Sequence, residues 1–252
     1  MATGSSRCPR LTESLPKELT GGTVLTTRTN RPARSIPVAT SSDADALEKG
    51  IKEKLPQPWS RWPGGYPGEI EIALLDAVRS IRARYRTRDT GVRGATARYR
   101  ESVGGGPLDD LTRLAAHDPE HLATIIGRQE TSGRTKAEAI VEAASNLSAA
   151  GVRGADDLQP ESHKGAYTRV RGLGKVTWEY FTMLLGKPGV KADTWVTRWV
   201  AEQIGRPVSS DEAGALVREV AGRMADAPDA SGPLLTRLDH QIWLTARGRQ
   251  RD

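Results

Sequence analysis

The residues most able to carry chemistry include a glycine-rich turn in the second half of the chain. Gly172 and Gly174 flank Leu173, and Lys175 follows directly. Glycine permits a left-handed turn in which backbone amides approach an anion without hindrance from a Cβ atom. Such a turn can hold a backbone phosphate of a nucleic acid and set its register without distinguishing one base from another.

An aspartate at the start of a later helix is the second reactive feature. Gly186, Pro188 and Gly189 end the helix that follows the turn, and Asp193 stands just before a new helical pattern. A carboxylate at this place can stabilise a positive charge that develops in a reaction, or deprotonate a water. The same position also suits a purely structural helix cap, so both roles are open for Asp193.

This arrangement resembles the helix-hairpin-helix Gly/Pro-Asp superfamily of DNA glycosylases, the endonuclease III and MutY group. The family hairpin usually reads Leu-Pro-Gly-hydrophobic-Gly-Arg-X-Thr-Ala, and residues 170–178 occupy its places. The family's aspartate-threonine pair falls on Asp193 and Thr194. The resemblance covers roughly residues 66–252. It implies an all-α, two-lobed fold with DNA across a central cleft and a flipped base between the lobes.

The resemblance also implies roles for single residues. Asp193 would be the catalytic carboxylate. Arg128 and Gln129 lie in a stretch similar to the one that places a wedge residue in the minor groove, where a long side chain fills the space that a flipped nucleotide leaves. An ordinary polar surface loop explains that stretch equally well. The hairpin residues expected to bind DNA are Gly172, Leu173, Gly174, Lys175 and Thr177.

Departures from the family pattern restrict the expected chemistry. Val176 stands where bifunctional members have a lysine nucleophile, so lyase activity by that route is not expected. Cys8 is the only cysteine, whereas an iron-sulfur cluster of the endonuclease III kind requires four. The four histidines show no metal-ligand spacing. The sequence therefore predicts no cofactor and no metal.

These features predict a monofunctional DNA glycosylase that hydrolyses the N-glycosidic bond of a damaged or modified base in duplex DNA and leaves an abasic site. A noncatalytic helix-hairpin-helix DNA-binding protein is the alternative, with Asp193 as a cap and the pocket filled by Trp178 or Trp195. A glycosylase with lyase activity through Lys175 is a weaker alternative. Lys175 is one residue away from Val176, where the family's lysine would fall, and a one-residue shift rotates a side chain by about 100° around a helix.

Composition agrees with a polyanionic partner and indicates the cellular compartment. The 252 residues carry a net charge of +6, and a single cysteine fits a reducing compartment. Neither a secretory signal nor a run long enough to span a bilayer is apparent. We therefore expect a cytoplasmic, nucleoid-associated monomer that binds double-stranded DNA.

The chain divides into a tail and a helical body. Residues 1–40 are rich in Ser, Thr, Gly, Pro and Arg and predict a flexible basic arm. Residues 41–252 predict the glycosylase-like domain, with one lobe at about 41–90 plus 190–252, another at about 91–189, and the hairpin at 163–185. Apolar periodicity predicts helices near 42–55, 69–85, 90–99, 108–114, 118–126, 135–147, 163–169, 176–185, 195–204, 209–224 and 233–243.

Two further interpretations concern side chains near the start of this body. Trp59, Trp62 and Tyr66 lie among turn residues. We expect them to pack on the body rather than to present their rings to bases. Glu71 and Asp76 lie on the helix predicted at 69–85, and we expect them to be solvated surface acids rather than contacts to a base edge.

Overall fold

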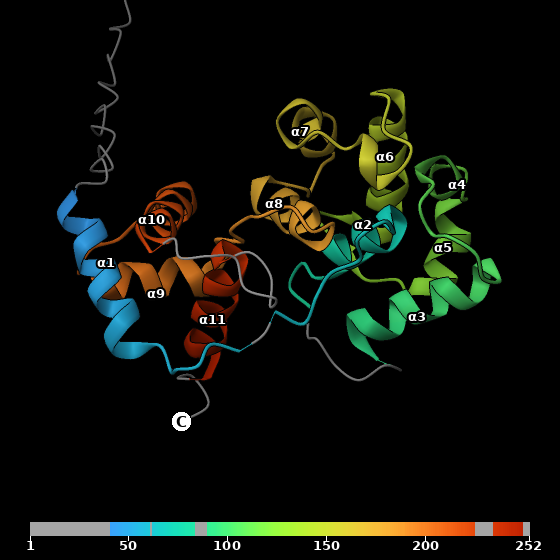
Figure 1. Ribbon diagram of the computed structural model, residues 1–252. Helices are drawn as coiled ribbons and strands as arrows, with labels where there is room; N and C mark the ends of the chain where they lie inside the picture. Colours follow the sequence, from blue (N-terminus) through green and yellow to red (C-terminus); the bar gives the residue numbers. More distant parts are fainter. Residues whose placement is uncertain (1–40, 61, 84–89, 225–233, 249–252) are drawn as a thin grey trace, which may run out of the picture. The chain divides into compact units, whose positions relative to one another are not determined.

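The computed structural model describes residues 41–60, 62–83, 90–224 and 234–248, all of which belong to one compact unit, residues 36–252. These residues are mostly α-helical (Figure 1), which confirms the predicted all-α class. The expected arm at 1–40 lies outside them. The α-helices are α1 (Ser41–Lys54), α2 (Ile70–Arg79), α3 (Gly91–Val103), α4 (Leu111–Ala115), α5 (Pro119–Ile126), α6 (Lys136–Ala149), α7 (Pro160–Thr168), α8 (Lys175–Leu184), α9 (Thr194–Ile204), α10 (Ser210–Arg223) and α11 (Leu234–Gly248).

Local capping residues start several helices where the sequence predicts. Thr135 and Glu138 form a reciprocal capping box at α6, in which each side chain accepts the other residue's backbone N–H. Ser209 caps α10 by accepting the N–H of Glu212. Asp118 caps α5, which begins at Pro119. These boundaries follow from short-range hydrogen bonds and could therefore be predicted from the sequence alone.

Helix α2 ends earlier than its apolar periodicity predicts. The periodicity extends to residue 85, whereas the helix stops at Arg79. The Lys136 ammonium donates hydrogen bonds to the carbonyl oxygens of Arg79 and Ile81, at 3.0 and 2.7 Å. Arg82 then takes a left-handed conformation with φ of 49°. A lysine from another helix therefore caps the end of α2, which periodicity cannot reveal.

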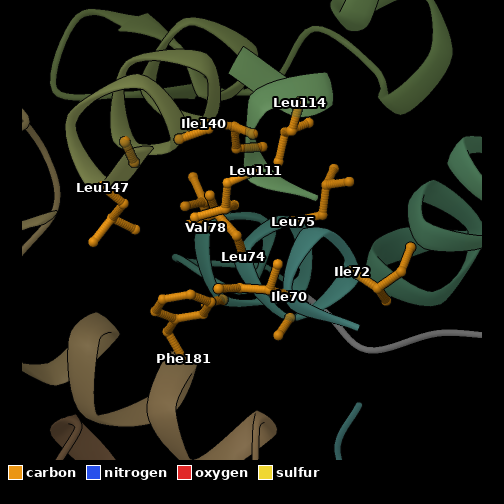
Figure 2. Packing of buried hydrophobic residues seen from close by; sticks show 14 of the residues in the cluster. Ile70, Ile72, Leu74, Leu75, Val78, Leu111, Leu114, Ile140, Leu147 and Phe181 are labelled. Atoms are coloured by element: carbon orange, nitrogen blue, oxygen red, sulfur yellow. The ribbon is translucent and has the colours of Figure 1, made fainter. Parts of the chain in front are cut away.

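A first buried cluster surrounds α2. Figure 2 shows Ile70, Leu74 and Val78 of this helix facing apolar side chains of α4, α6 and α8. The cluster is formed by residues between 70 and 185. The lobe division predicted from the sequence groups residues 41–90, and therefore α2, with residues 190–252. In the structure the buried residues of α2 pack with the helices between residues 91 and 185.

A second buried cluster joins the two ends of the described chain. It contains residues of α1, α9, α10 and α11, which lie together in Figure 1. Trp59 packs against this cluster, whereas Trp62 and Tyr66 pack against the first one. Packing of these three aromatic residues on the body is therefore confirmed.

The segment that carries these aromatics is held closely by its neighbours. The N–H of Tyr66 donates to the carbonyl of Leu184 at 2.5 Å, and the N–H of Ser60 donates to Gln241 Oε1 at 2.9 Å. A Cβ atom at Gly65 would overlap the Leu184 carbonyl. The close approach therefore requires glycine at this position.

Two acids of α2 are buried, so the expectation of solvated surface acids is wrong. Glu71 is fully buried, and Asp76 is 3% exposed. The Glu71 carboxylate accepts hydrogen bonds from Arg113, the Tyr99 hydroxyl and a backbone N–H. A buried carboxylate needs such partners. The sequence pattern failed here because α2 is covered on all sides by other helices.

A small hairpin and a short helix complete the described elements. Strands β1 (Glu130–Thr131) and β2 (Arg134–Thr135) pair in an antiparallel ladder, and the 3₁₀ helix η1 covers Ala155–Asp157. Of the helices in the described ranges, none is long and apolar enough to cross a membrane.

Candidate active site

Asp193 begins α9 and has one carboxylate oxygen in a structural role. Its Oδ1 accepts the backbone N–H groups of Trp195 and Val196 at 2.8 and 3.2 Å. These bonds satisfy donors that the first helical turn leaves unpaired. The other oxygen has no hydrogen-bond partner among the described residues. The capping and reactive roles weighed from the sequence are therefore geometrically compatible.

A first cavity of about 600 Å³ lies beside this carboxylate. Apart from Asp193 and Arg198, its lining consists of uncharged side chains, most of them small or apolar. Val176 of α8 also lines it, so Val176 and Asp193 face the same space. The lining residues are Val176, Ala192, Asp193, Thr194, Thr197, Arg198, Ala201, Pro207, Val208 and Ser210.

A second cavity, of about 610 Å³, has aromatic walls. Trp62 packs edge-on against His240 with ring centroids 5.2 Å apart, and Trp243 stacks on His240 with ring centroids 6.1 Å apart. Asp76 also lines the cavity and accepts the Tyr66 hydroxyl at 2.9 Å. The full lining is Trp62, Pro63, Gly64, Gly65, Tyr66, Asp76, Arg93, Tyr180, Leu184, Lys191, Asp239, His240, Trp243 and Leu244.

Lys191 lies in this second cavity, two residues before Asp193. Its Nζ is 3.5 Å from the centre of the Tyr180 ring and donates to Ser80 Oγ over 3.3 Å. Burial lowers the pKa of Lys191, and the nearby carboxylates of Asp193 and Asp76 act in the opposite direction. Cation–π contact with Tyr180 favours the charged ammonium.

Asp239 of α11 lines the same cavity and is only 4% exposed. Its Oδ1 has no hydrogen-bond partner among the described residues. Burial raises the pKa of Asp239 to about 8, and the Asp193 carboxylate adds to this rise, whereas the positive charge of Lys191 opposes it. The two cavities are thus linked electrostatically through Asp193.

The glycine turn has the backbone form that the sequence predicts at Gly172. This residue has φ of 91°, a conformation that favours glycine. Leu173 is 6% exposed and anchors the turn in the first cluster. The N–H of Gly174 donates to the Thr177 hydroxyl at 3.0 Å, so Thr177 caps the start of α8. Gly174 and Lys175 are exposed.

The Lys175 side chain has an acidic partner in this structure. Its Nζ lies 2.7 Å from Asp211 Oδ1 on the surface. Solvent screens such a pair, so exchange of the aspartate for a phosphate is inexpensive. Lys175 borders a small crevice with Val176 and does not line either of the two larger cavities.

The stretch that carries Arg128 and Gln129 leads into the β1–β2 hairpin. Both side chains are exposed and engaged: Arg128 pairs with Glu120 at 2.6 Å, and Gln129 Oε1 accepts from Lys136 Nζ at 3.1 Å. The hairpin tip lies against the glycine turn, because a Cβ atom at Gly172 would be 3.0 Å from Ser132 Oγ. The structure therefore brings together two segments that the sequence singled out separately.

Sequence reasoning missed Lys191 and Asp239. Lys191 could have been noticed as an ionisable residue beside Asp193. Asp239 gave no signal, because a single acid in an amphipathic helix is normally solvated. Within the part of the chain that the structure describes, no three His, Cys, Asp or Glu side chains are grouped to hold a metal ion.

Comparison with solved structures identifies the fold as that of DNA glycosylases. The chain is similar to H. pylori 3-methyladenine DNA glycosylase (MagIII) bound to 1,N6-ethenoadenine, with a TM-score of 0.58 and 14% identity over 84% of this chain and 99% of that chain. It is also similar to MBOgg1 in complex with a low-affinity DNA ligand, with a TM-score of 0.51 and 13% identity over 72% and 61% of the two chains.

Sequence comparison then places the chain in a family. Residues 45–247 match the family described as "Domain of unknown function (DUF8548)", so the chain belongs to that family. Comparison with curated protein sequences found no match.

Proposed function

We propose that this protein is a monofunctional DNA glycosylase that removes a damaged or modified base from duplex DNA and leaves an abasic site. The observation that carries the proposal is the Asp193 carboxylate, which lines a cavity of about 600 Å³ while only one of its oxygens caps α9. The likeness to MagIII and MBOgg1, which are DNA glycosylases, supports this class of activity.

In this proposal Asp193 acts on the sugar side of the scissile bond. As the N-glycosidic bond breaks, positive charge builds on the deoxyribose, and the carboxylate stabilises it and orients or deprotonates a water. The bonds to the first turn of α9 hold the Asp193 carboxylate in place. Val176 offers no amine to the same space, which supports hydrolysis without lyase chemistry.

Double-stranded DNA would lie against the glycine turn and the neighbouring β1–β2 hairpin. Gly172, Gly174 and Lys175 would hold a backbone phosphate, with Leu173 and Thr177 fixing the turn. Arg128 or Gln129 would fill the space left by the extruded nucleotide after releasing its present partner. We propose that the protein acts as a monomer.

The test uses duplexes that each carry one modified base, including 1,N6-ethenoadenine. Wild type and Asp193→Asn are incubated with each duplex, the DNA is treated with alkali, and strand breaks at the modified site are measured. Asparagine retains helix-capping ability, so the variant should fold. Asp156→Asn, an exposed aspartate outside both cavities, is the matched control. Undiminished cleavage by Asp193→Asn would remove Asp193 from its proposed role.

The same experiment addresses the noncatalytic alternative, in which Trp178 or Trp195 fills the pocket. Trp178 is buried in the first cluster, and neither tryptophan lines either cavity. Salt-sensitive binding of duplex DNA without release of any base would nevertheless favour this alternative.

A further inference from the structure

The aromatic cavity has spare hydrogen-bonding capacity at Lys191. An ammonium group has three donors. Among the described residues, the Lys191 Nζ makes one hydrogen bond, to Ser80 Oγ over 3.3 Å, and otherwise lies above the Tyr180 ring. Lys191 is partly buried, and a partly buried cation with few acceptors gains from a further acceptor. Lys191 therefore has donors available for a molecule in the cavity.

The same cavity has a spare acceptor at Asp239. This side chain is 4% exposed, and its Oδ1 is unpartnered among the described residues. Buried polar atoms normally have a hydrogen-bond partner, and an exception calls for an explanation. The negative charge of Asp193 raises the pKa of this carboxyl group, whereas the positive charges of Lys191 and Arg218 lower it. A ligand with an N–H group would provide the missing partner.

The walls around these two groups suit a flat ring. Trp62, His240 and Trp243 form a contiguous aromatic cluster, in which Trp62 meets His240 edge-on and Trp243 stacks on His240, and Tyr180 lies on the side of Lys191. The volume of about 610 Å³ is large enough for a nucleobase. Aromatic faces with a few polar groups are the usual way in which proteins hold an unstacked base.

We propose that Lys191 and Asp239 recognise one edge of the extruded base, and that this base carries an amino group beside a ring acceptor. The ammonium donates to the acceptor, and the Asp239 carboxyl accepts from the amino group. This inference rests on the proposed function, because it concerns the base that Asp193 would release. The backbone of Lys191 already bonds the Asp239 carboxyl group, but a base without the amino group leaves Asp239 Oδ1 unpaired and is disfavoured for that reason.

The test measures binding of 9-methyladenine and 9-methylpurine, which differ by one amino group, to the full-length protein. Binding is followed by tryptophan fluorescence and checked by isothermal titration calorimetry. We expect 9-methyladenine to bind about fivefold more tightly, the usual effect of one hydrogen bond between uncharged groups. Lys191→Met should weaken binding of both compounds about tenfold. Asp239→Leu should reduce only the preference for 9-methyladenine, to less than about twofold.

Two controls separate these effects from changes in folding. Lys187→Met and Asp156→Asn alter exposed residues outside the cavity and should bind both compounds as wild type does. Asp239→Asn retains an acceptor and should keep part of the preference, which a general disturbance of the cavity would not allow.

Several outcomes would overturn the inference: no binding of either compound, equal binding of both by wild type, or an unchanged preference in Asp239→Leu. None of these measurements requires a bond to break. A protein that prefers 9-methyladenine but releases no base from any duplex would retain the inference and lose the proposed function. Release of bases with and without an amino group at equal rates would retain the proposed function and overturn the inference.

Discussion

The two larger cavities have nearly equal volumes, about 600 and 610 Å³, but differ in chemistry. The first is lined mostly by small and apolar side chains and receives the carboxylate of Asp193. The second has aromatic walls and contains Lys191 and Asp239, whose pKa values are shifted mainly by burial. Under our two proposals the cavities have a division of labour, with bond breaking at Asp193 and base recognition in the aromatic cavity.

Two structural elements connect the cavities. On α8, Val176 lines the first cavity and Tyr180, one turn later on the same face, lines the second. In the segment before α9, Lys191 belongs to the second cavity and Asp193 to the first, and the Asp193 N–H bonds the Lys191 carbonyl at 2.6 Å. One face of α8 and the tight turn before α9 therefore fix the spacing between the two cavities.

The largest expected effect concerns the rate of base release. Asp193→Asn should lower the single-turnover rate by about 100-fold or more, because it removes charge that stabilises the transition state. Asp239→Leu should lower the rate by only about tenfold, through loss of one recognition contact. Rates on a duplex that wild type cleaves provide the measurement. Equal losses in both variants would contradict the division of labour.

An effect of intermediate size is expected from the aromatic wall. Trp62→Ala should weaken binding of 9-methyladenine by about tenfold, since stacking on one aromatic side chain contributes about 1–3 kcal/mol. Trp62 is only partly buried, so stability should change little. Trp195→Ala, which removes a partly buried indole outside both cavities, is the control. Similar losses in the two variants would show that the wall has no special role.

The ionisation of Asp239 predicts how stability depends on pH. Its pKa is raised from 3.8 to about 8, so between these values the folded protein holds a proton that the unfolded chain has released. The free energy of unfolding therefore falls as pH rises through this window. Asp239→Leu should flatten the decline, and its stability relative to wild type should increase from pH 5 to pH 8. Urea denaturation at both pH values tests this, and parallel shifts would refute it.

The smallest effect is expected at Lys175, which lies outside both cavities. Lys175→Gln should weaken duplex binding by a few-fold and reduce the magnitude of the salt dependence by about one phosphate contact. The rate of base release from bound DNA should not change. Borohydride treatment with duplexes containing an abasic site should trap no adduct in wild type or variant. A trapped adduct that depends on Lys175 would instead support the lyase alternative.

Features with short-range causes could be predicted from the sequence. Thr135 and Glu138 predicted a helix start, because the two residues of a capping box are only three positions apart in the sequence. Gly172 predicted a left-handed turn, because glycine tolerates a positive φ, and Asp193 predicted a helix start, because its side chain can accept the first backbone N–H groups. The all-α class followed from apolar periodicity in the same way.

Only the tertiary structure decided which side chains meet. Asp239 joins Lys191 in one cavity because α11 packs against α9, and the sequence separation of the two residues hides this contact. Burial of α2 on every side turned Asp76 from an expected surface acid into part of a cavity wall. Local hydrogen bonds fix the elements, whereas long-range packing fixes the burial and charge of each ionisable group, and chemistry depends on both.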